Sequence, residues 1–298
     1  MEIKRACESM LFVGGDMRQI RAANRIAEYG YSVSILGFSA TDKEKFSERI
    51  RRLDNLDEVD KNFDAVVLPL PYTIDGENIN TNPDGQKITT GELVKKLSPE
   101  TVVLGGKCDR KIIKIAEQRG LNVVDYFDRE DLQILNAIPT AEGAIQIAME
   151  EVKHTIHSSK CLVIGNGRIG KILSKMLDGM GAEVTVAARK NRDRVQAFAA
   201  GLKSIPICSL YEEIGSFDII FNTAPSLILD SDLLVKTRRD TVIIDLASSP
   251  GGVDFESARR IGIKVIWALS LPGKVAPDTA GDIIGKTILN ILDELEAK

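Results

Sequence analysis

Three glycines follow an apolar segment at the spacing of a dinucleotide-binding turn, in the run Cys161-Leu-Val-Ile-Gly-Asn-Gly-Arg-Ile-Gly170. In such turns the first glycine lets the chain leave the strand sharply, the second leaves room for a pyrophosphate, and the third lets the helix pack closely on the strand. The helix that follows directs its first N–H groups and its positive dipole end toward the phosphates. We therefore predict that a nucleotide binds at Gly165, Asn166, Gly167, Arg168, Ile169 and Gly170.

The residues on either side of this turn favour a strand-helix-strand unit. The run Lys160-Cys-Leu-Val-Ile164 precedes the turn, and Glu183-Val-Thr-Val-Ala-Ala188 forms a second strand-like run. Between them, apolar residues recur at helical spacing and predict a helix over residues 168–180: Ile169, Ile172, Leu173, Met176 and Leu177. A glycine-rich structural turn in another kind of α/β domain is the alternative interpretation.

The end of the second strand indicates which nucleotide binds. Sites for NAD usually place an acidic residue there, about 20 residues past the motif, where it accepts hydrogen bonds from the ribose hydroxyls. This sequence has Arg189 and Lys190 at the strand end, with Arg192 close behind. Cations suit the 2′-phosphate of NADP, and guanidinium also matches its geometry. We predict that Arg189 and Lys190 bind NADP; a solvated basic helix start that accepts either cofactor is the alternative.

Composition and charge exclude several classes of protein. The 298 residues carry a formal net charge of −4, and the longest apolar runs have the length of strands, so neither nucleic acid nor membrane is an expected partner. The four cysteines are scattered, so we expect no metal site and no disulfide framework. The first residues show no signal-peptide pattern. These features lead us to expect a cytoplasmic enzyme.

Strand and helix patterns alternate along the chain in two series, which is typical of parallel sheets covered by helices on both faces. The predicted fold class is α/β, with two doubly wound parallel-sheet domains, of which the second is a Rossmann domain that binds a nucleotide. The expected strands are residues 10–13, 32–36, 65–68, 101–104 and 122–124 in the first series, and 160–164, 184–187, 218–221, 241–245 and 264–267 in the second.

Two helices are expected to connect the domains. Pro139 and Thr140 are predicted to open a long helix between them. The last helix has a broad apolar face and is expected to cross back onto the first domain, with contacts in a homo-oligomer as the alternative. The expected boundaries are 1–137 for an N-terminal substrate domain, 138–157 for the connecting helix, 158–277 for the Rossmann domain and 278–298 for the C-terminal helix.

The first series begins with a turn that departs from the glycine motif. Gly14 stands at the first motif position, but Asp16 and Gln19 stand where Gly167 and Gly170 stand in the second series. A carboxylate at this point repels a pyrophosphate, and both side chains obstruct its close approach to the backbone. We therefore expect this half to bind no dinucleotide and to contribute substrate contacts instead.

Loops at the carboxyl ends of the strands are expected to form a substrate cleft between the domains, because open α/β sheets bind ligands at that edge. In the first domain these loops are residues 14–19 and 68–73, and in the second they are residues 246–252 and 271–277. The residues expected beside the ribose nearest the nicotinamide are Asn222, Thr223, Ala224 and Pro225. For each polar side chain here, ordinary turn chemistry is the alternative role.

The sequence has only two histidines, His154 and His157, at the end of the expected connecting helix. Neither falls in a loop expected around the nicotinamide. Capping or packing near a helix end is therefore their default role. A reaction that does not need a strong protein base is consistent with this pattern.

Five segments distributed over the whole chain support a more specific interpretation: Gly14-Gly-Asp-Met-Arg-Gln19, Ile138-Pro-Thr-Ala-Glu-Gly143, Gly165-Asn-Gly-Arg-Ile-Gly170, Asp245-Leu-Ala-Ser-Ser-Pro-Gly-Gly252 and Leu271-Pro-Gly-Lys-Val-Ala-Pro277. In this combination and order the chain resembles the family of the dipicolinate synthase A-subunit. The resemblance implies a protein that works with a smaller, flavoprotein-like B-subunit in the mother cell of spore-forming bacteria. Together they would oxidise a dihydrodipicolinate, derived from the lysine pathway, to pyridine-2,6-dicarboxylate.

This implied chemistry assigns candidate catalytic residues. Oxidation of a dihydropyridine yields an aromatic ring, so the demand on a protein base is modest. The two carboxylates of the substrate require cations or N–H groups. Arg18 is the first candidate, with Lys274 and either Ser248 or Ser249 as weaker ones. If the intermediate arrives hydrated, Asp16 or Glu142 could assist the loss of water. A helix cap and a first-turn carboxylate are their alternative roles.

Two other functions are consistent with the sequence. One is a different NADP-dependent dehydrogenase of two domains, similar to shikimate dehydrogenase or methylenetetrahydrofolate dehydrogenase. A lysine and aspartate pair in the first domain would favour the former, and no such pair stands at a convincing spacing. The other is a non-catalytic scaffold in which NADP binding controls association with a partner.

Overall fold

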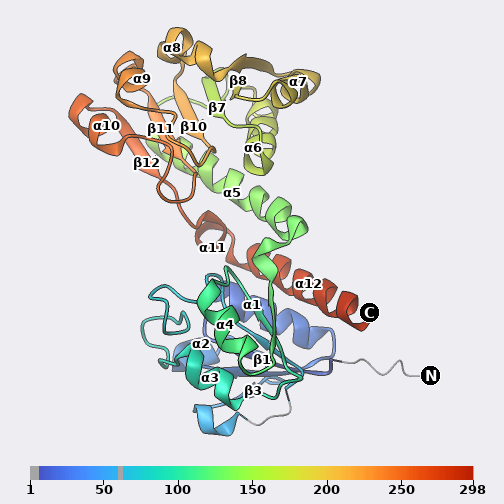
Figure 1. The fold of residues 1–298 in the computed structure, drawn as a ribbon. Helices are drawn as coiled ribbons and strands as arrows, with labels where there is room; N and C mark the ends of the chain where they lie inside the picture. The colour runs from blue at the N-terminus through green and yellow to red at the C-terminus, as the bar shows by residue number, and fades with distance from the viewer. Residues whose placement is uncertain (1–6, 60–62, 298) are drawn as a thin grey trace. The chain divides into compact units, whose positions relative to one another are not determined.

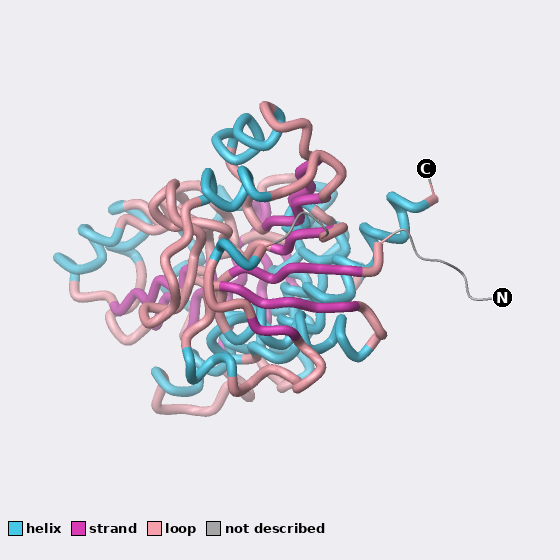
Figure 2. Tube along the Cα trace, turned by 90° about the horizontal axis from the view of Figure 1, so that it is seen from below, coloured by secondary structure: helices cyan, strands magenta, loops and turns pink. Residues whose placement is uncertain are grey.

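The computed structural model describes residues 7–59 and 63–297. The chain divides into two compact units: unit 1 comprises Met1–Leu135 with Ala276–Lys298, and unit 2 comprises Asn136–Val275. Each unit contains a six-stranded, wholly parallel sheet flanked by helices (Figures 1 and 2). The predicted fold class, α/β with two doubly wound parallel sheets, is confirmed.

The sheet of unit 1 has the strand order β3-β2-β1-β4-β5-β6. Alternate strand residues face two separate apolar clusters: Phe12 and Ile35 pack toward α1 and α12, whereas Leu11 and Val66 pack toward α3 and α4. The strands are β1 Ser9–Val13, β2 Ser32–Leu36, β3 Arg51–Arg52, β4 Ala65–Val67, β5 Val102–Gly105 and β6 Asn122–Asp125. The helices are α1 Met17–Glu28, α2 Ala40–Lys43, α3 Thr90–Lys96, α4 Arg110–Glu117 and α12 Pro277–Glu296, with the first part of α5 Glu130–Glu151.

The sheet of unit 2 has the order β12-β11-β10-β7-β8-β9, which is the same path of strands as in unit 1. Its central strands carry apolar residues on both faces, as expected for a sheet covered on both sides. The strands are β7 Lys160–Ile164, β8 Glu183–Ala188, β9 Lys203–Pro206, β10 Ile219–Asn222, β11 Val242–Asp245 and β12 Lys264–Trp267. The helices are α6 Arg168–Gly179, α7 Asn191–Ala199, α8 Leu210–Glu213, α9 Ser231–Lys236, α10 Phe255–Ile261 and α11 Leu271–Val275, with the rest of α5.

Two strands are not predicted by the sequence pattern, and both lie at sheet edges. Both residues of β3, Arg51 and Arg52, are exposed, and β9 buries only Ile205 fully. Edge strands of this kind lack the apolar run that identifies a buried parallel strand.

Among the described residues, no helix is long and apolar enough to cross a membrane.

The long helix α5 differs from the predicted connecting helix at both ends. It begins at Glu130, contains Pro139 in its interior and ends at Glu151, so the expectation that Pro139 opens the helix, and the range 138–157, are wrong. Proline cannot donate to the carbonyl four residues earlier. Pro139 therefore leaves the Leu135 carbonyl without its usual helical donor. The Thr140 hydroxyl donates to the next carbonyl, that of Asn136, at 2.7 Å. Ala137 and Ala141, on either side of Pro139, are fully buried, and their packing outweighs the preference of proline for a helix start.

The C-terminal helix α12 belongs to unit 1 and packs along α1. Its buried residues include Ile284, Ile288 and Ile291, which join the cluster beneath β1 and β2. Close approach of the two helices depends on Gly281, because a Cβ atom there would lie 2.5 Å from the Arg21 Cβ and 2.6 Å from the Arg18 carbonyl oxygen. An ion pair between Arg21 and Asp282, at 2.8 Å, closes the edge of this contact.

Gly281→Ala is expected to lower the free energy of unfolding by about 1–3 kcal/mol, because the added methyl group would push α12 away from the α1 backbone. Urea unfolding measures the change. The matched control is Gly91→Ala in α3, where no atom lies within 4 Å of the added carbon, so that both variants gain the same helix propensity. Equal stability of the two variants would contradict the close packing of α1 and α12.

Candidate nucleotide-binding site

The turn after β7 meets the three requirements of the glycine motif with three different local geometries. Gly165 has a φ of +100°, and a Cβ atom there would collide with the Thr223 hydroxyl. A Cβ atom on Gly170 would collide with the Gly165 carbonyl oxygen, so α6 approaches the turn as closely as the backbone permits. Around Gly167, by contrast, no described atom lies within 4 Å of the added carbon. The space at Gly167 is therefore open, as a pyrophosphate requires.

The first turn of α6 faces this open space. Gly167 is the N-cap residue, and no side chain among the described residues caps the helix. Arg168 is exposed, and Ile169 is partly buried against the apolar cluster of unit 2. A helix N-terminus without a side-chain cap offers its N–H groups and positive dipole end to an anion. The turn therefore fits the phosphates of a dinucleotide.

The loop after β8 is held in place by two polar contacts. The Asn166 amide donates to the Asp193 carbonyl at 2.7 Å and so joins the glycine turn to α7. The Arg194 guanidinium donates to the carbonyls of Ala188 and Arg189, at 3.0 and 2.9 Å. Asn166 is predicted as a cofactor ligand, but its amide is used within the protein. The role of Arg194 in holding this loop cannot be predicted from the sequence, because its partners are backbone carbonyls, which every residue has.

Arg189 and Lys190, the residues predicted to bind a 2′-phosphate, lie at the end of β8 and at the N-cap of α7. Both are exposed. Within residues 7–59 and 63–297, neither side chain makes an ion pair or a hydrogen bond. By contrast, Arg192 is paired with Asp193 at 3.4 Å. The two predicted cations are therefore available to a bound anion.

The loop after β10 is organised by a buried polar network. The Asn222 amide donates to the Asp245 carboxylate at 2.8 Å and to the Ala224 carbonyl at 3.1 Å. Asp245 also accepts from the backbone N–H groups of Ala247 and Gly252, at 3.1 and 2.8 Å. Asn222 and Asp245 are fully buried. The amide predicted to lie beside the ribose is thus committed to joining the loops after β10 and β11.

The other residues predicted in these loops lie nearer the surface. The Thr223 hydroxyl donates to the Ile164 carbonyl at 2.9 Å, which places it against Gly165. Ala224 is partly exposed, and Pro225 and Ser249 are exposed. Thr223 therefore shapes the glycine turn through its hydroxyl, while Ala224, Pro225 and Ser249 remain accessible to a ligand.

The corresponding turn of unit 1 is closed by its own chain. Gly15 donates to the Asn80 carbonyl at 2.8 Å, and a Cβ atom on Gly14 would lie 2.7 Å from that same oxygen. Gln19, 2% exposed, fills the space beside Gly15 and donates to the Val67 carbonyl at 3.0 Å. Protein atoms thus occupy the positions at which the turn of unit 2 is open, which supports the expectation that this half binds no dinucleotide.

Asp16 and Arg18 form one structural element at the start of α1. Asp16 is the N-cap, accepting from the Arg18 backbone N–H, and its carboxylate also pairs with the guanidinium, at 2.7 Å to Nη2 and 3.0 Å to Nε. Nη2 donates further to the Leu70 carbonyl at 2.5 Å. Only Nη1 of Arg18 has no partner among the described residues. Capping, the alternative that the sequence left open for Asp16, is the role it has here.

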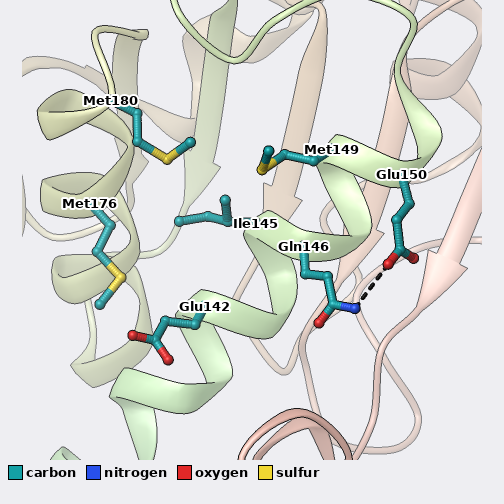
Figure 3. Close-up of a pocket in the computed structure, with 7 residues that line it drawn as sticks. All are labelled: Glu142, Ile145, Gln146, Met149, Glu150, Met176 and Met180. Carbon is teal, nitrogen blue, oxygen red and sulfur yellow. Dashed lines mark hydrogen bonds between the residues drawn. The ribbon is translucent and has the colours of Figure 1, made fainter.

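Glu142 lies on α5, far from a helix start, because α5 begins at Glu130; the first-turn role considered for it is therefore wrong. Its exposed carboxylate lies at one end of an open groove between α5 and α6 (Figure 3). Apolar side chains line most of this groove: Ile145, Met149, Met176 and Met180.

The two histidines lie at the opposite edge of the sheet from the glycine turn. His154 and His157 precede β7, whereas Gly165 follows it. The five residues of β7 separate the two edges by roughly 16 Å. The His154 and His157 rings contact Ser159 and Ser158, at 3.0 and 2.9 Å. Both histidines thus have local structural partners.

Comparisons with known proteins agree with this division of the chain. Residues 9–127 match the family model described as the N-terminal domain of the dipicolinate synthase A-subunit. Residues 146–266 match the model of shikimate / quinate 5-dehydrogenase. The chain is 33% identical to the dipicolinate synthase A-subunit of Bacillus subtilis (strain 168), in an alignment of 288 residues that covers 96% of each protein. The chain belongs to the dipicolinate synthase A-subunit family.

Solved structures of this family have the same fold as the chain. The A-subunit from Bacillus subtilis superposes with a TM-score of 0.90 at 31% identity, covering 100% of this chain and 99% of that one. The A-subunit from Bacillus halodurans superposes with a TM-score of 0.88 at 30% identity, covering 96% and 97%. The family and the dehydrogenase-type fold together make the protein an NAD(P)-dependent oxidoreductase. The open turn at Gly167 is where its residues fit the cofactor.

Gly167→Ala is expected to weaken binding of NADPH and NADH on the order of tenfold, because the methyl group enters the space of the pyrophosphate. Its unfolding free energy should stay unchanged, since nothing in the described protein meets that group. Calorimetric titration and urea unfolding measure the two effects. Gly170→Ala is the contrasting variant and should lose stability through the collision with Gly165. Unaltered cofactor binding by a folded Gly167→Ala protein would rule out this site.

Proposed function

We propose that the chain binds NADP in unit 2 and uses it to oxidise dihydrodipicolinate to dipicolinate, acting with a second, flavoprotein-like chain, the dipicolinate synthase B-subunit. The observation that carries the proposal is the full-length relationship to the dipicolinate synthase A-subunit, together with an open glycine turn in unit 2. The substrate would come from the lysine pathway, either as the dihydro compound or as its hydrated tetrahydro precursor. The mother cell of a sporulating bacterium, and its cytoplasm, would be the place of action.

The choice of NADP rests on the charges at the end of β8. Arg189 and Lys190 are exposed and make no ion pair within the described residues. Arg194 holds the carbonyls of Ala188 and Arg189, so the loop that carries the two cations has a defined conformation. A 2′-phosphate beside them gains charge-assisted hydrogen bonds, whereas the free hydroxyl of NAD gains much less.

The cofactor supplies the acceptor for the hydride that leaves the dihydropyridine ring. The glycine turn orients it through the N–H groups at the start of α6, and orientation of this kind accounts for much of the catalysis in such enzymes. Loss of a hydride and a proton gives an aromatic product, so a weak proton acceptor is sufficient. The position of both histidines at the other edge of the sheet is consistent with this chemistry.

In unit 1 we assign the substrate carboxylates to the loops at the carboxyl ends of the strands. Arg18 offers Nη1 to a carboxylate while Asp16 and the Leu70 carbonyl fix the rest of its guanidinium. Asp16, bound to Arg18 and capping α1, serves mainly to position that group. Glu142 is exposed and remains the candidate in unit 2 for assisting loss of water from a hydrated substrate. Ser249, also exposed, remains a weaker candidate for binding a substrate carboxylate.

The double variant Arg189→Ala/Lys190→Ala is expected to raise the dissociation constant of NADPH on the order of tenfold or more, since both charges that face the 2′-phosphate are lost. The dissociation constant of NADH should change little. Calorimetric titration of both cofactors provides the comparison. Arg239→Ala is the control for losing an exposed cation elsewhere in unit 2: Arg239 precedes β11, at the opposite edge of the sheet. A wild-type protein that binds NADH as tightly as NADPH would overturn the assignment.

The reaction is tested by mixing the full chain with NADP⁺ and the hydrated tetrahydrodipicolinate, with and without the purified B-subunit. Dipicolinate and NADPH, each followed by its ultraviolet absorbance, should form in equal amounts. Cofactor binding without product, even with both chains present, would show a non-catalytic scaffold. Reduction of NADP⁺ with shikimate in place of the dicarboxylate would show a dehydrogenase of the shikimate type.

A further inference from the structure

Lys107 adopts a backbone conformation that lysine rarely takes. Its φ is +58°, and it lies two residues after the end of β5, at the carboxyl edge of the unit 1 sheet. The Asp125 carboxylate holds this conformation, since it accepts from the N–H groups of Lys107 and Cys108, at 3.1 and 2.6 Å. Glycine would take such a conformation without steric strain. Strained residues of this kind cluster at active sites and ligand-binding loops.

The ammonium group of Lys107 is held in place but is not neutralised. It lies 5.1 Å from the centre of the Phe127 ring, a distance at which the ring face attracts a cation. The side chain is exposed, and in the described part of the chain it makes no ion pair or side-chain hydrogen bond. A cation fixed by an aromatic ring keeps its full charge for an anion.

Leu70 contacts both the Arg18 side chain and the turn that carries Lys107. The Arg18 Nη2 donates to the Leu70 carbonyl, and a Cβ atom on Gly106 would lie 2.9 Å from the Leu70 Cα. Gly106 immediately precedes Lys107, and its carbonyl accepts from Tyr72, at 2.8 Å. The Arg18 side chain and the turn that carries Lys107 therefore both adjoin the loop after β4, and they follow the neighbouring strands β1 and β5.

The surroundings of Lys107 are otherwise acidic. Burial, with further contributions from Asp125, Asp109 and Asp128, raises the pKa of the Cys108 thiol to about 12. Three carboxylates thus act on the residue next to Lys107. A doubly negative ligand that approaches this corner is repelled unless Lys107 compensates, so its charge has more influence on such a ligand than an isolated surface lysine would have.

We infer that Lys107 binds the second carboxylate of the substrate, while Arg18 binds the first. This inference rests on the proposed function, because it requires a rigid ligand with two carboxylates. The ring atoms between those carboxylates keep them at a fixed separation. Recognition by two cations on separate loops then selects dicarboxylates over ligands with a single carboxylate.

The test compares two probes, pyridine-2,6-dicarboxylate and pyridine-2-carboxylate, by calorimetric titration of the full chain in the presence of NADP⁺. The wild type should bind the dicarboxylate at least about tenfold more tightly. Lys107→Met should lose this preference, with little change for the monocarboxylate and none for NADPH. Lys107→Arg should retain most of it. Lys107→Gly should lose it as well but without a fall in melting temperature, which separates the charge from the backbone conformation.

Lys114→Met on α4 is the matched control, because it removes an exposed lysine of the same unit. It should leave all of these constants unchanged. If Lys107→Met and Lys107→Gly both keep the wild-type preference, the role assigned to Lys107 is wrong and the proposed function stands. If the wild type itself does not distinguish the two probes, the proposed function fails and this inference fails with it.

Discussion

The closeness of α6 to the turn after β7 is the constraint on which the nucleotide site depends. Gly170 packs against the Gly165 carbonyl with no room for a methyl group, and Thr223 fills the other side of Gly165. Because this contact is between backbone atoms, which have no rotamers to adjust, it fixes the start of α6 relative to the turn. The open space at Gly167 then lies directly before the helix N-terminus, where both the N–H groups and the dipole favour an anion.

The two units share one strand order, but the turn after the first strand has a different role in each. In unit 1 the N–H groups of Gly15 and Arg18 donate to the Asn80 carbonyl and the Asp16 carboxylate, and the buried Gln19 side chain fills the space beside Gly15. Buried donors must be paired. A turn paired in this way is stable without a ligand, whereas the turn of unit 2 leaves this pairing to solvent or cofactor. Asp16 and Gln19, which stand where unit 2 has Gly167 and Gly170, therefore distinguish a structural turn from a binding turn.

Local features can be predicted from the sequence, and partners distant in the chain cannot. The three glycines act within one turn, and the two cations follow a strand end, so residues 165–170 and 189–190 are recognisable from spacing alone. Asn222 is expected to face the ribose, but Asp245 on the next strand along takes its amide. The predicted start of α5 is wrong because tertiary packing tolerates Pro139 inside a helix. Nothing in the residue type of Lys107 signals its left-handed backbone.

The pairing state of each cation bears on what it can contribute to binding. Arg18 is already bound to Asp16 through two nitrogens, with its side chain 14% exposed, so a ligand at Nη1 gains a directed hydrogen bond but only part of a charge. Such a group favours ligands of the right geometry more than it adds to their electrostatic attraction. Net attraction for a dianion must then come from cations without a carboxylate partner, and Lys107 meets that condition in unit 1. The same reasoning applies to Arg189 and Lys190 in unit 2, where unpaired charge coincides with the end of β8 and the expected position of a 2′-phosphate.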